Sequence, residues 1–180
     1  MRWLTFILFA LLILTLQTTL APRMQVFGCR ADWVLVVVTF FALRVRPRDA
    51  VLAGWFIGAL ADLMTIERMG LMSVSYALAA GLVASLREFV WRDRIAAQVV
   101  VTLIASVFVR SLWGMYRHVM YAQLDESTLA VLRDIAGGSL YTAAWAPLVH
   151  APLAAGGGVF GVPRLRPTRG RAGWIGAERV

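Results

Sequence analysis

Long hydrophobic stretches make up most of the chain, and short connections rich in arginine, glycine and proline separate them. A membrane-spanning helix takes on the order of 20 apolar residues, so this chain has room for about five or six spans. We therefore predict an all-α protein whose helices form one compact bundle. The predicted helices cover residues 3–21, 33–43, 50–64, 70–86, 95–109 and 135–153.

Some of the predicted helices have unusual lengths or ends. The first follows Arg2 like a secretory signal, but its long apolar run and the further runs behind it favour a retained helix. The second is short for a span. Pro147 and Pro152 are expected to bend or end the sixth, so five spans are an alternative to six. The aromatic segment 111–134 is expected to lie along the outer interface or to extend the fifth helix.

The composition is that of an integral membrane protein. Hydrophobic residues make up 60% of the chain, charged residues 16%, and the mean hydropathy is +0.73. The net charge of +8 comes from 18 basic residues, all of them arginine. Because these arginines lie between apolar stretches, membrane topology explains them and nucleic-acid binding is not expected. The single cysteine, Cys29, excludes an intramolecular disulfide framework.

The arginine distribution predicts the orientation, because cytoplasmic connections carry an excess of basic residues. With both termini in the cytoplasm, twelve arginines lie inside: Arg2, Arg44, Arg46, Arg48, Arg87, Arg92, Arg94, Arg164, Arg166, Arg169, Arg171 and Arg179. Six lie outside: Arg23, Arg30, Arg68, Arg110, Arg117 and Arg133. This excess favours an even number of spans.

Residues 1–155 are expected to form the transmembrane helical domain, and residues 156–180 a flexible, basic cytoplasmic tail. The tail is rich in glycine, proline and arginine, so it has too little apolar surface to offset the entropy of ordering it. Its arginines would either bind anionic lipid headgroups or only help to set the topology.

The segment "GWFIGALADL" places Gly54, Gly58 and Asp62 four residues apart, and therefore on one face of a helix. Small residues at this spacing allow a neighbouring helix to approach closely, and Gly81 in the next helix is a further candidate for such packing. A carboxylate within a span is costly unless it is paired or near water, so Asp62 needs a partner or a place near the interface.

Four polar residues are predicted to share one layer in the outer half of the bundle. At about 1.5 Å per residue, Asp62, Gln17 and Arg110 lie roughly 18, 21 and 22 Å from the inner ends of their helices. Asp32 begins the second helix on the outer side. We expect an outward-facing cavity or groove here, and the matched depth predicts an Asp62–Arg110 contact. The alternative is that Asp62 only ends its helix at the interface.

No catalytic or metal-binding pattern accompanies these residues. His118 and His150 are isolated, and the spacings typical of zinc sites, nucleophile elbows and phosphate-binding loops are absent from the sequence. We therefore predict neither enzymatic activity nor a cofactor. Trp113, Tyr116 and Tyr121, in the aromatic outer segment, are candidate partner contacts.

Four stretches resemble the MreD family of bacterial rod-shape-determining membrane proteins: "LTLQTTLAP", "ADWVLVVVTFFALR", "GWFIGALADL" and "GLMSVSYALAAGLVASLR". Their order and spacing carry the resemblance, which covers residues 4–87. The matching positions are Gln17, Asp32, Gly54, Gly58, Asp62, Gly70, Tyr76 and Gly81. The chain departs from many family members at Ala31, where they have proline, and in its longer tail.

The resemblance implies a non-enzymatic component of the cell-elongation machinery, the elongasome, in the bacterial inner membrane. The implied partners are an MreC-like protein, RodA with a class B penicillin-binding protein, the lipid bilayer and, on the cytoplasmic side, MreB. Together they would organise lateral peptidoglycan synthesis.

The family is also similar in fold to the six-helix S components of energy-coupling-factor importers. The alternative function is therefore a substrate-binding subunit of a small-molecule importer. An interaction protein should present an apolar groove to a partner segment, whereas an importer subunit should enclose a pocket with several convergent polar groups.

Overall fold

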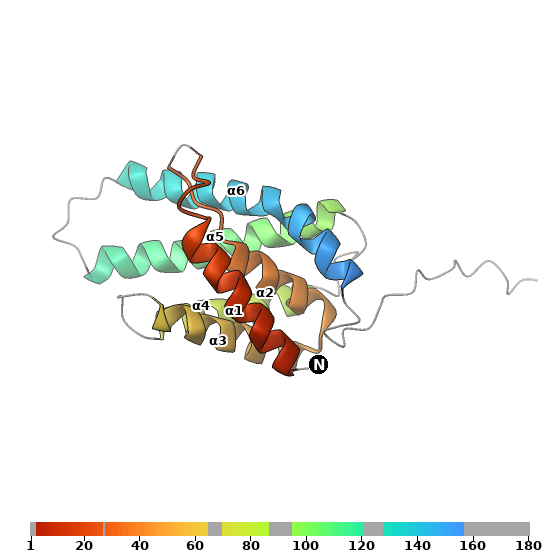
Figure 1. The fold of residues 1–180 in the computed structure, drawn as a ribbon. Helices are drawn as coiled ribbons and strands as arrows, with labels where there is room; N and C mark the ends of the chain where they lie inside the picture. Colours follow the sequence, from red (N-terminus) through yellow and green to blue (C-terminus); the bar gives the residue numbers. More distant parts are fainter. Residues whose placement is uncertain (1–2, 27, 65–69, 87–94, 121–127, 157–180) are drawn as a thin grey trace, which may run out of the picture.

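The computed structural model describes residues 3–26, 28–64, 70–86, 95–120 and 128–156, and over these ranges the chain forms a bundle of six α-helices (Figure 1). All six predicted helices are present in the predicted order. They are α1 (Trp3–Thr19), α2 (Trp33–Arg44), α3 (Pro47–Leu63), α4 (Leu71–Leu86), α5 (Ile95–Met120) and α6 (Thr128–Ala155). The predicted tail beyond Gly156 lies outside the described residues.

Helices α5 and α6 are longer than predicted. Residues 111–120 of the aromatic segment belong to α5, which ends at Met120. Of the two predicted placements, this part of the segment therefore extends the fifth helix. Helix α6 begins at Thr128 and continues through Pro147 and Pro152 to Ala155, so neither proline ends the helix. Each proline removes one backbone hydrogen bond, but α6 packs along α5 and α2, and this packing stabilises the remaining turns.

Helix α2 lies at the centre of the bundle and contacts each of the other five helices. Its residues from Trp33 to Leu43 are all buried, as expected of a helix that is apolar on every side. The ring of Phe41 packs edge-on against Phe6 of α1, with ring centroids 5.1 Å apart. Because protein surrounds α2, its 12 residues do not have to match the bilayer thickness on their own.

The helices alternate in direction. Figure 1 shows the start of α1 and the last turn of α6 at the same end of the bundle. We call the opposite end the Asp32 end: α1, α3 and α5 finish there, and α2, α4 and α6 begin there.

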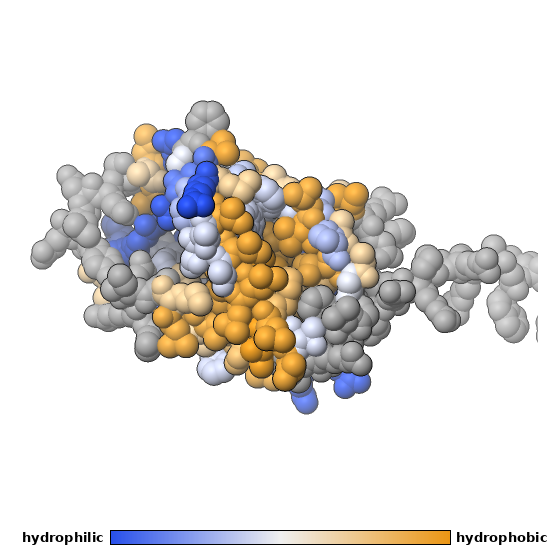
Figure 2. All heavy atoms as spheres, viewed as in Figure 1, coloured by the Kyte–Doolittle hydropathy of each residue, from blue (hydrophilic) through white to orange (hydrophobic). Residues whose placement is uncertain are grey.

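Much of the bundle surface is apolar. Figure 2 shows hydrophobic side chains along α1, where Leu4, Leu8 and Leu12 are 76%, 61% and 56% exposed. By length and composition, α5 is the one described helix that could cross a bilayer, while α1, α2 and α4 are shorter apolar helices. Continuous apolar surface of this kind is suited to contact with lipid or protein.

Candidate functional site

Helices α3 and α4 form a close hairpin at Gly54 and Gly58. A Cβ atom on Gly54 would lie 2.6 Å from the carbonyl oxygen of Tyr76, and one on Gly58 would lie 2.5 Å from the Cα atom of Ser73. The two backbones can approach this closely because glycine has no side chain. Gly81 differs, since an added Cβ would lie 3.6 Å from Val51, which is ordinary van der Waals contact. Of the three predicted packing positions, the structure therefore requires glycine at Gly54 and Gly58 but not at Gly81.

Asp62 lies at the end of α3, only 4% exposed, and binds the start of α4. Its carboxylate accepts hydrogen bonds from the backbone N–H groups of Gly70, Met72 and Ser73, each at 3.0 Å, and from the Ser73 hydroxyl. These N–H groups have no partner within their own helix, and they carry the positive end of its dipole. Gly70 reaches this position with a φ of 105°, a conformation that glycine adopts readily. Asp62 thus caps a neighbouring helix.

Gln17 of α1 binds the backbone on both sides of Asp32. Its Nε2 atom donates to the carbonyl oxygen of Ala31 at 3.0 Å, and its Oε1 atom accepts from the N–H group of Trp33 at 3.0 Å. A side-chain amide can donate and accept at once, so one glutamine satisfies both groups. Gln17 thereby holds the chain at the point where α2 begins.

Asp32 connects α2 to two further helices. One carboxylate oxygen accepts the N–H group of Leu35 at 2.9 Å as an N-cap, and the other accepts the hydroxyl of Tyr76 on α4 at 2.8 Å. Its own N–H group donates to Oγ1 of Thr142 on α6 at 3.0 Å. With Gln17 beside it, this short segment joins α1, α2, α4 and α6.

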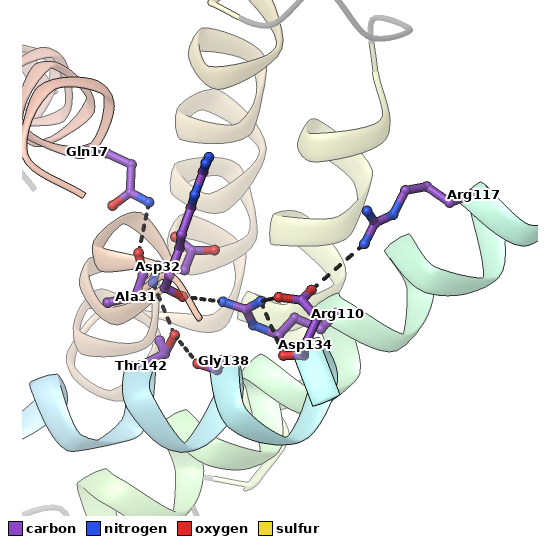
Figure 3. A network of polar contacts seen from close by, with 9 residues as sticks. Gln17, Ala31, Asp32, Arg110, Arg117, Asp134, Gly138 and Thr142 are labelled. Atoms are coloured by element: carbon purple, nitrogen blue, oxygen red, sulfur yellow. Dashed lines mark hydrogen bonds and ion pairs between the residues drawn. The ribbon is translucent and has the colours of Figure 1, made fainter. Parts of the chain in front are cut away.

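Arg110 of α5 binds α6 and the chain that precedes α2 (Figure 3). Its Nη1 atom donates to Oδ1 of Asp134 at 3.0 Å, and its Nη2 atom donates to the carbonyl oxygen of Arg30 at 2.6 Å. A Cβ atom on Gly138 would overlap the guanidinium group. The partners of Arg110 are therefore Asp134 and Arg30 in place of the predicted Asp62, because Asp62 faces the start of α4.

A cavity of about 640 Å³ lies among these groups at the Asp32 end, and all six helices contribute to its lining. Of the predicted polar layer, Gln17, Asp32 and Arg110 line the cavity, whereas Asp62 lies outside its lining. Other polar lining residues are Thr18, Gln25, Arg30, Tyr76, Arg117 and Asp134. Apolar lining residues include Leu14, Met64, Met72, Val109 and Trp113.

The candidate partner contacts are placed differently from one another. Trp113 lines the cavity, and Tyr116, on the same helix, does not. Tyr121 lies outside the described residues. The predicted aromatic surface therefore contributes one described side chain to the cavity.

Three residues of α6 that complete the site were not predicted from the sequence. Asp134, Gly138 and Thr142 are four residues apart, so they lie on one face of that helix. Asp134 binds Arg110, and Gly138 leaves room for the guanidinium group of Arg110. Thr142 accepts a hydrogen bond from the backbone N–H group of Asp32. The spacing was visible in the sequence, but the predicted helix began at residue 135 and left the first of them in a connection.

A second polar cluster is buried between α2, α5 and α6, farther from the Asp32 end. His150 is 2% exposed, with Nε2 3.0 Å from the carbonyl oxygen of Val36 and Nδ1 3.3 Å from Oε1 of Gln98. The hydroxyl oxygens of Thr39 and Thr102 are 3.3 Å apart beside it. His150 is thus a buried histidine with hydrogen-bond partners.

Among the described residues, no group of three His, Cys, Asp or Glu side chains could hold a metal ion.

The family model for the rod shape-determining protein MreD matches residues 1–146. The chain belongs to the MreD family. The match includes every residue that lines the cavity. No curated protein and no solved structure matches the chain.

MreD-family membership establishes a membrane protein with a role in rod-shape determination. The family is a shape-determining one and is not known for catalysis. In this MreD-family protein the polar network at the Asp32 end joins α1, α2, α4, α5 and α6 around the cavity.

Tyr76→Phe is expected to lower the free energy of unfolding of this MreD-family protein by about 1.5–3 kcal/mol, because the half-buried Asp32 carboxylate would lose the hydroxyl donor of the buried Tyr76. Unfolding in detergent, followed by circular dichroism, measures the change. Tyr141→Phe is the matched control, since that hydroxyl donates to the carbonyl oxygen of Met24 at an exposed position. Equal losses in the two variants would contradict a special role for the Asp32 contact.

Proposed function

We propose that the protein is a non-enzymatic, multi-pass component of the cell-elongation machinery in the bacterial inner membrane. In this proposal it binds an MreC-like protein and helps to organise lateral peptidoglycan synthesis by RodA and a class B penicillin-binding protein. The observation that carries the proposal is the match of residues 1–146 to the MreD family.

The proposed orientation places both termini in the cytoplasm and the Asp32 end outside. Support comes from the arginine excess on the inner side and from the common position of the α1 start and the α6 end (Figure 1). The cavity then faces the compartment in which the synthases act. MreB, if it binds this protein, would meet the opposite end.

The cavity is the proposed contact site for the MreC-like protein. Hydrogen bonds around the cavity join α1, α2, α4, α5 and α6, and they would hold its shape before a partner binds. A preformed site lowers the ordering cost of binding. Its apolar wall, including Trp113, supplies buried area of the kind that anchors partner segments.

Copurification tests this proposal. The full chain, carrying an affinity tag, is expected to retain a co-expressed MreC-like protein in mild detergent. Replacing the cavity residue Trp113 by alanine should reduce the retained amount at least fivefold, whereas Trp55→Ala, on the exposed face of α3, should leave it unchanged. Failure of the unaltered protein to retain the MreC-like protein would overturn the proposal.

A substrate-binding subunit of a small-molecule importer is a second candidate, and one observation favours it. The cavity volume of about 640 Å³ is typical of ligand pockets, and Gln17, Asp32, Tyr76 and Arg110 converge on it. This candidate predicts that the protein, purified without any partner, retains a small molecule detectable by mass spectrometry after denaturation. Retention of such a molecule together with absence of the MreC-like protein would favour the importer function.

A further inference from the structure

The apolar part of α3 is shorter than a bilayer of ordinary thickness. Its first turn carries Arg48 and Asp49, so the apolar part consists of the 14 residues from Ala50 to Leu63. At about 1.5 Å per residue, this part is about 21 Å long. The hydrocarbon core of a typical bilayer is about 30 Å thick. Either the protein or the lipid has to accommodate the difference of about 9 Å.

Backbone contacts fix both ends of α3. Pro47 lies in the first turn, and the N-cap residue Arg46 has an extended conformation. At the other end, the N–H group of the C-cap residue Met64 donates to the carbonyl oxygens of Ala61 and Asp62. The Asp62 carboxylate is bound to the start of α4. Helix α3 therefore does not continue beyond these residues.

The two neighbours of α3 are short as well. Helices α1 and α4 both contact α3, and with 17 and 16 residues they are about 26 and 24 Å long. Helix α1 ends at Thr19, and exposed Pro22 and Arg23 follow it. Together α1, α3 and α4 form what we call the short side of the bundle.

Helices α5 and α6 form the long side. They have 26 and 28 residues, or about 39 and 42 Å, and they extend past α3 at the Asp32 end (Figure 1). Among the described residues, α3 contacts neither of them. Exposed apolar side chains recur along α5 from Val100 to Val119 and along α6 from Leu129 to Leu148, which is about 29 Å in each helix. The long side thus matches the hydrocarbon core.

Neither a tilt of the bundle nor long side chains remove the mismatch on the short side. A tilt that fits the long helices to the bilayer reduces the height of α3 further. Arg48 can extend its guanidinium group toward the headgroups, but the carboxylate of Asp49 is on a short side chain one residue farther along α3. A carboxylate within hydrocarbon is costly, whereas thinning a bilayer costs little for each ångström.

The charge at one end of the short side favours lipid over a second copy of the chain. Residues 44–49 and 87–94, which precede α3 and follow α4, hold six arginines and three acidic residues. Arg46 and Arg48 are exposed there. Guanidinium groups pair well with lipid phosphates. Two copies inserted in the same direction would instead bring two positively charged ends together, which is unfavourable.

We propose that the short side of the bundle contacts a locally thinned bilayer, while the long side contacts a bilayer of ordinary thickness. This inference rests on the multi-pass insertion that belongs to the proposed function, but on no protein partner. Ala61 and Met64, near the Asp32 end of α3, line the cavity. The thinned bilayer therefore brings lipid headgroups close to the cavity.

Spin labels on the full chain measure the bilayer thickness on each side. In a Cys29→Ser background, single cysteines replace exposed Val51 or Leu63 on α3 and, as the matched control, exposed Val100 or Val119 on α5. The two positions are about 18 Å apart on α3 and about 29 Å apart on α5. Oxygen and nickel accessibility in dioleoylphosphatidylcholine vesicles gives the depth of each label. We expect all four labels to lie within about 3 Å of the headgroups, which a uniform bilayer of about 30 Å does not allow on α3.

A longer apolar part should reduce the thinning. Replacing Arg48 and Asp49 together by leucine lengthens the apolar part of α3 by two residues, or about 3 Å. The label at position 51 is then expected to lie about 3 Å deeper. Arg92→Leu combined with Asp93→Leu is the matched control, because it removes the same two charges from the connection after α4 and leaves α3 unchanged.

Equal thickness beside α3 and α5 would overturn the proposal, whether both values are near 30 Å or both are near 21 Å. Labels on α3 that neither oxygen nor nickel reaches would also overturn it, and crosslinking through Leu63→Cys would identify a second copy as the cover. Water-like nickel accessibility at every α3 label would contradict multi-pass insertion itself. Failure to retain the MreC-like protein would leave this inference unaffected.

Discussion

Replacing Asp62 by alanine is expected to lower the free energy of unfolding by about 3 kcal/mol or more, one of the two largest effects that the structure predicts. The loss exceeds the usual 0.5–2 kcal/mol for removing an N-cap, because three backbone N–H groups and a hydroxyl all donate to this carboxylate. Without it, three backbone donors at the start of α4 would lose their acceptor, and the N–H group of Ser73 would lose it at a buried position. Denaturant titration in detergent micelles measures the change.

Asp62→Asn separates capping from a role as a surface charge. Both carboxylate oxygens accept backbone N–H groups, so the NH₂ group of an asparagine would face a donor whichever way the amide turned. We expect Asp62→Asn to be nearly as destabilising as Asp62→Ala. Asp49→Asn, in the first turn of α3, should cost only about 0.3–1 kcal/mol, since it alters a helix-dipole interaction. An asparagine variant as stable as the unaltered chain would show that Asp62 merely ends its helix.

Gly58→Ala is expected to be destabilising by about 2–3 kcal/mol, although alanine is the better helix former. The added Cβ would lie 2.5 Å from the Cα atom of Ser73 and 2.6 Å from the carbonyl oxygen of Met72. These are backbone atoms, which cannot rotate away, so α3 and α4 would have to separate. That separation would also draw the start of α4 away from Asp62 and displace Met72 at the cavity wall. The copurified amount of the MreC-like protein should therefore fall together with stability.

Gly81→Ala is the matched control for this prediction. Its added Cβ would meet only Val51, at 3.6 Å, and the preference of alanine for helices should leave stability unchanged or raise it by up to about 1 kcal/mol. Both variants add one methyl group to an interior position of the same hairpin. Similar unfolding free energies for the two would mean that the close approach at Gly58 is not needed.

The pattern of the sequence predicted the helices well because that pattern is local. Apolar stretches interrupted by arginine, glycine and proline mark where a helix can begin and end, and the structure has all six helices in order. Spacing by four residues likewise identified Gly54, Gly58 and Asp62 as one face, and this face does meet α4. The lengths of α5 and α6 were underestimated, because contacts between these two helices stabilise turns that appear polar or proline-containing in isolation.

What the sequence by itself determined is a helical membrane protein of the MreD family, with polar residues concentrated toward one end. Depth along a helix follows from the rise per residue, so Gln17, Asp62 and Arg110 could be assigned to one layer without knowing their neighbours. Only the tertiary structure decided which of them meet. The rotation of each helix about its axis depends on packing against all the others, and it directs Arg110 to Asp134 and Asp62 to the start of α4. The cavity that results belongs to no single segment of the chain, because six helices must come together to form it.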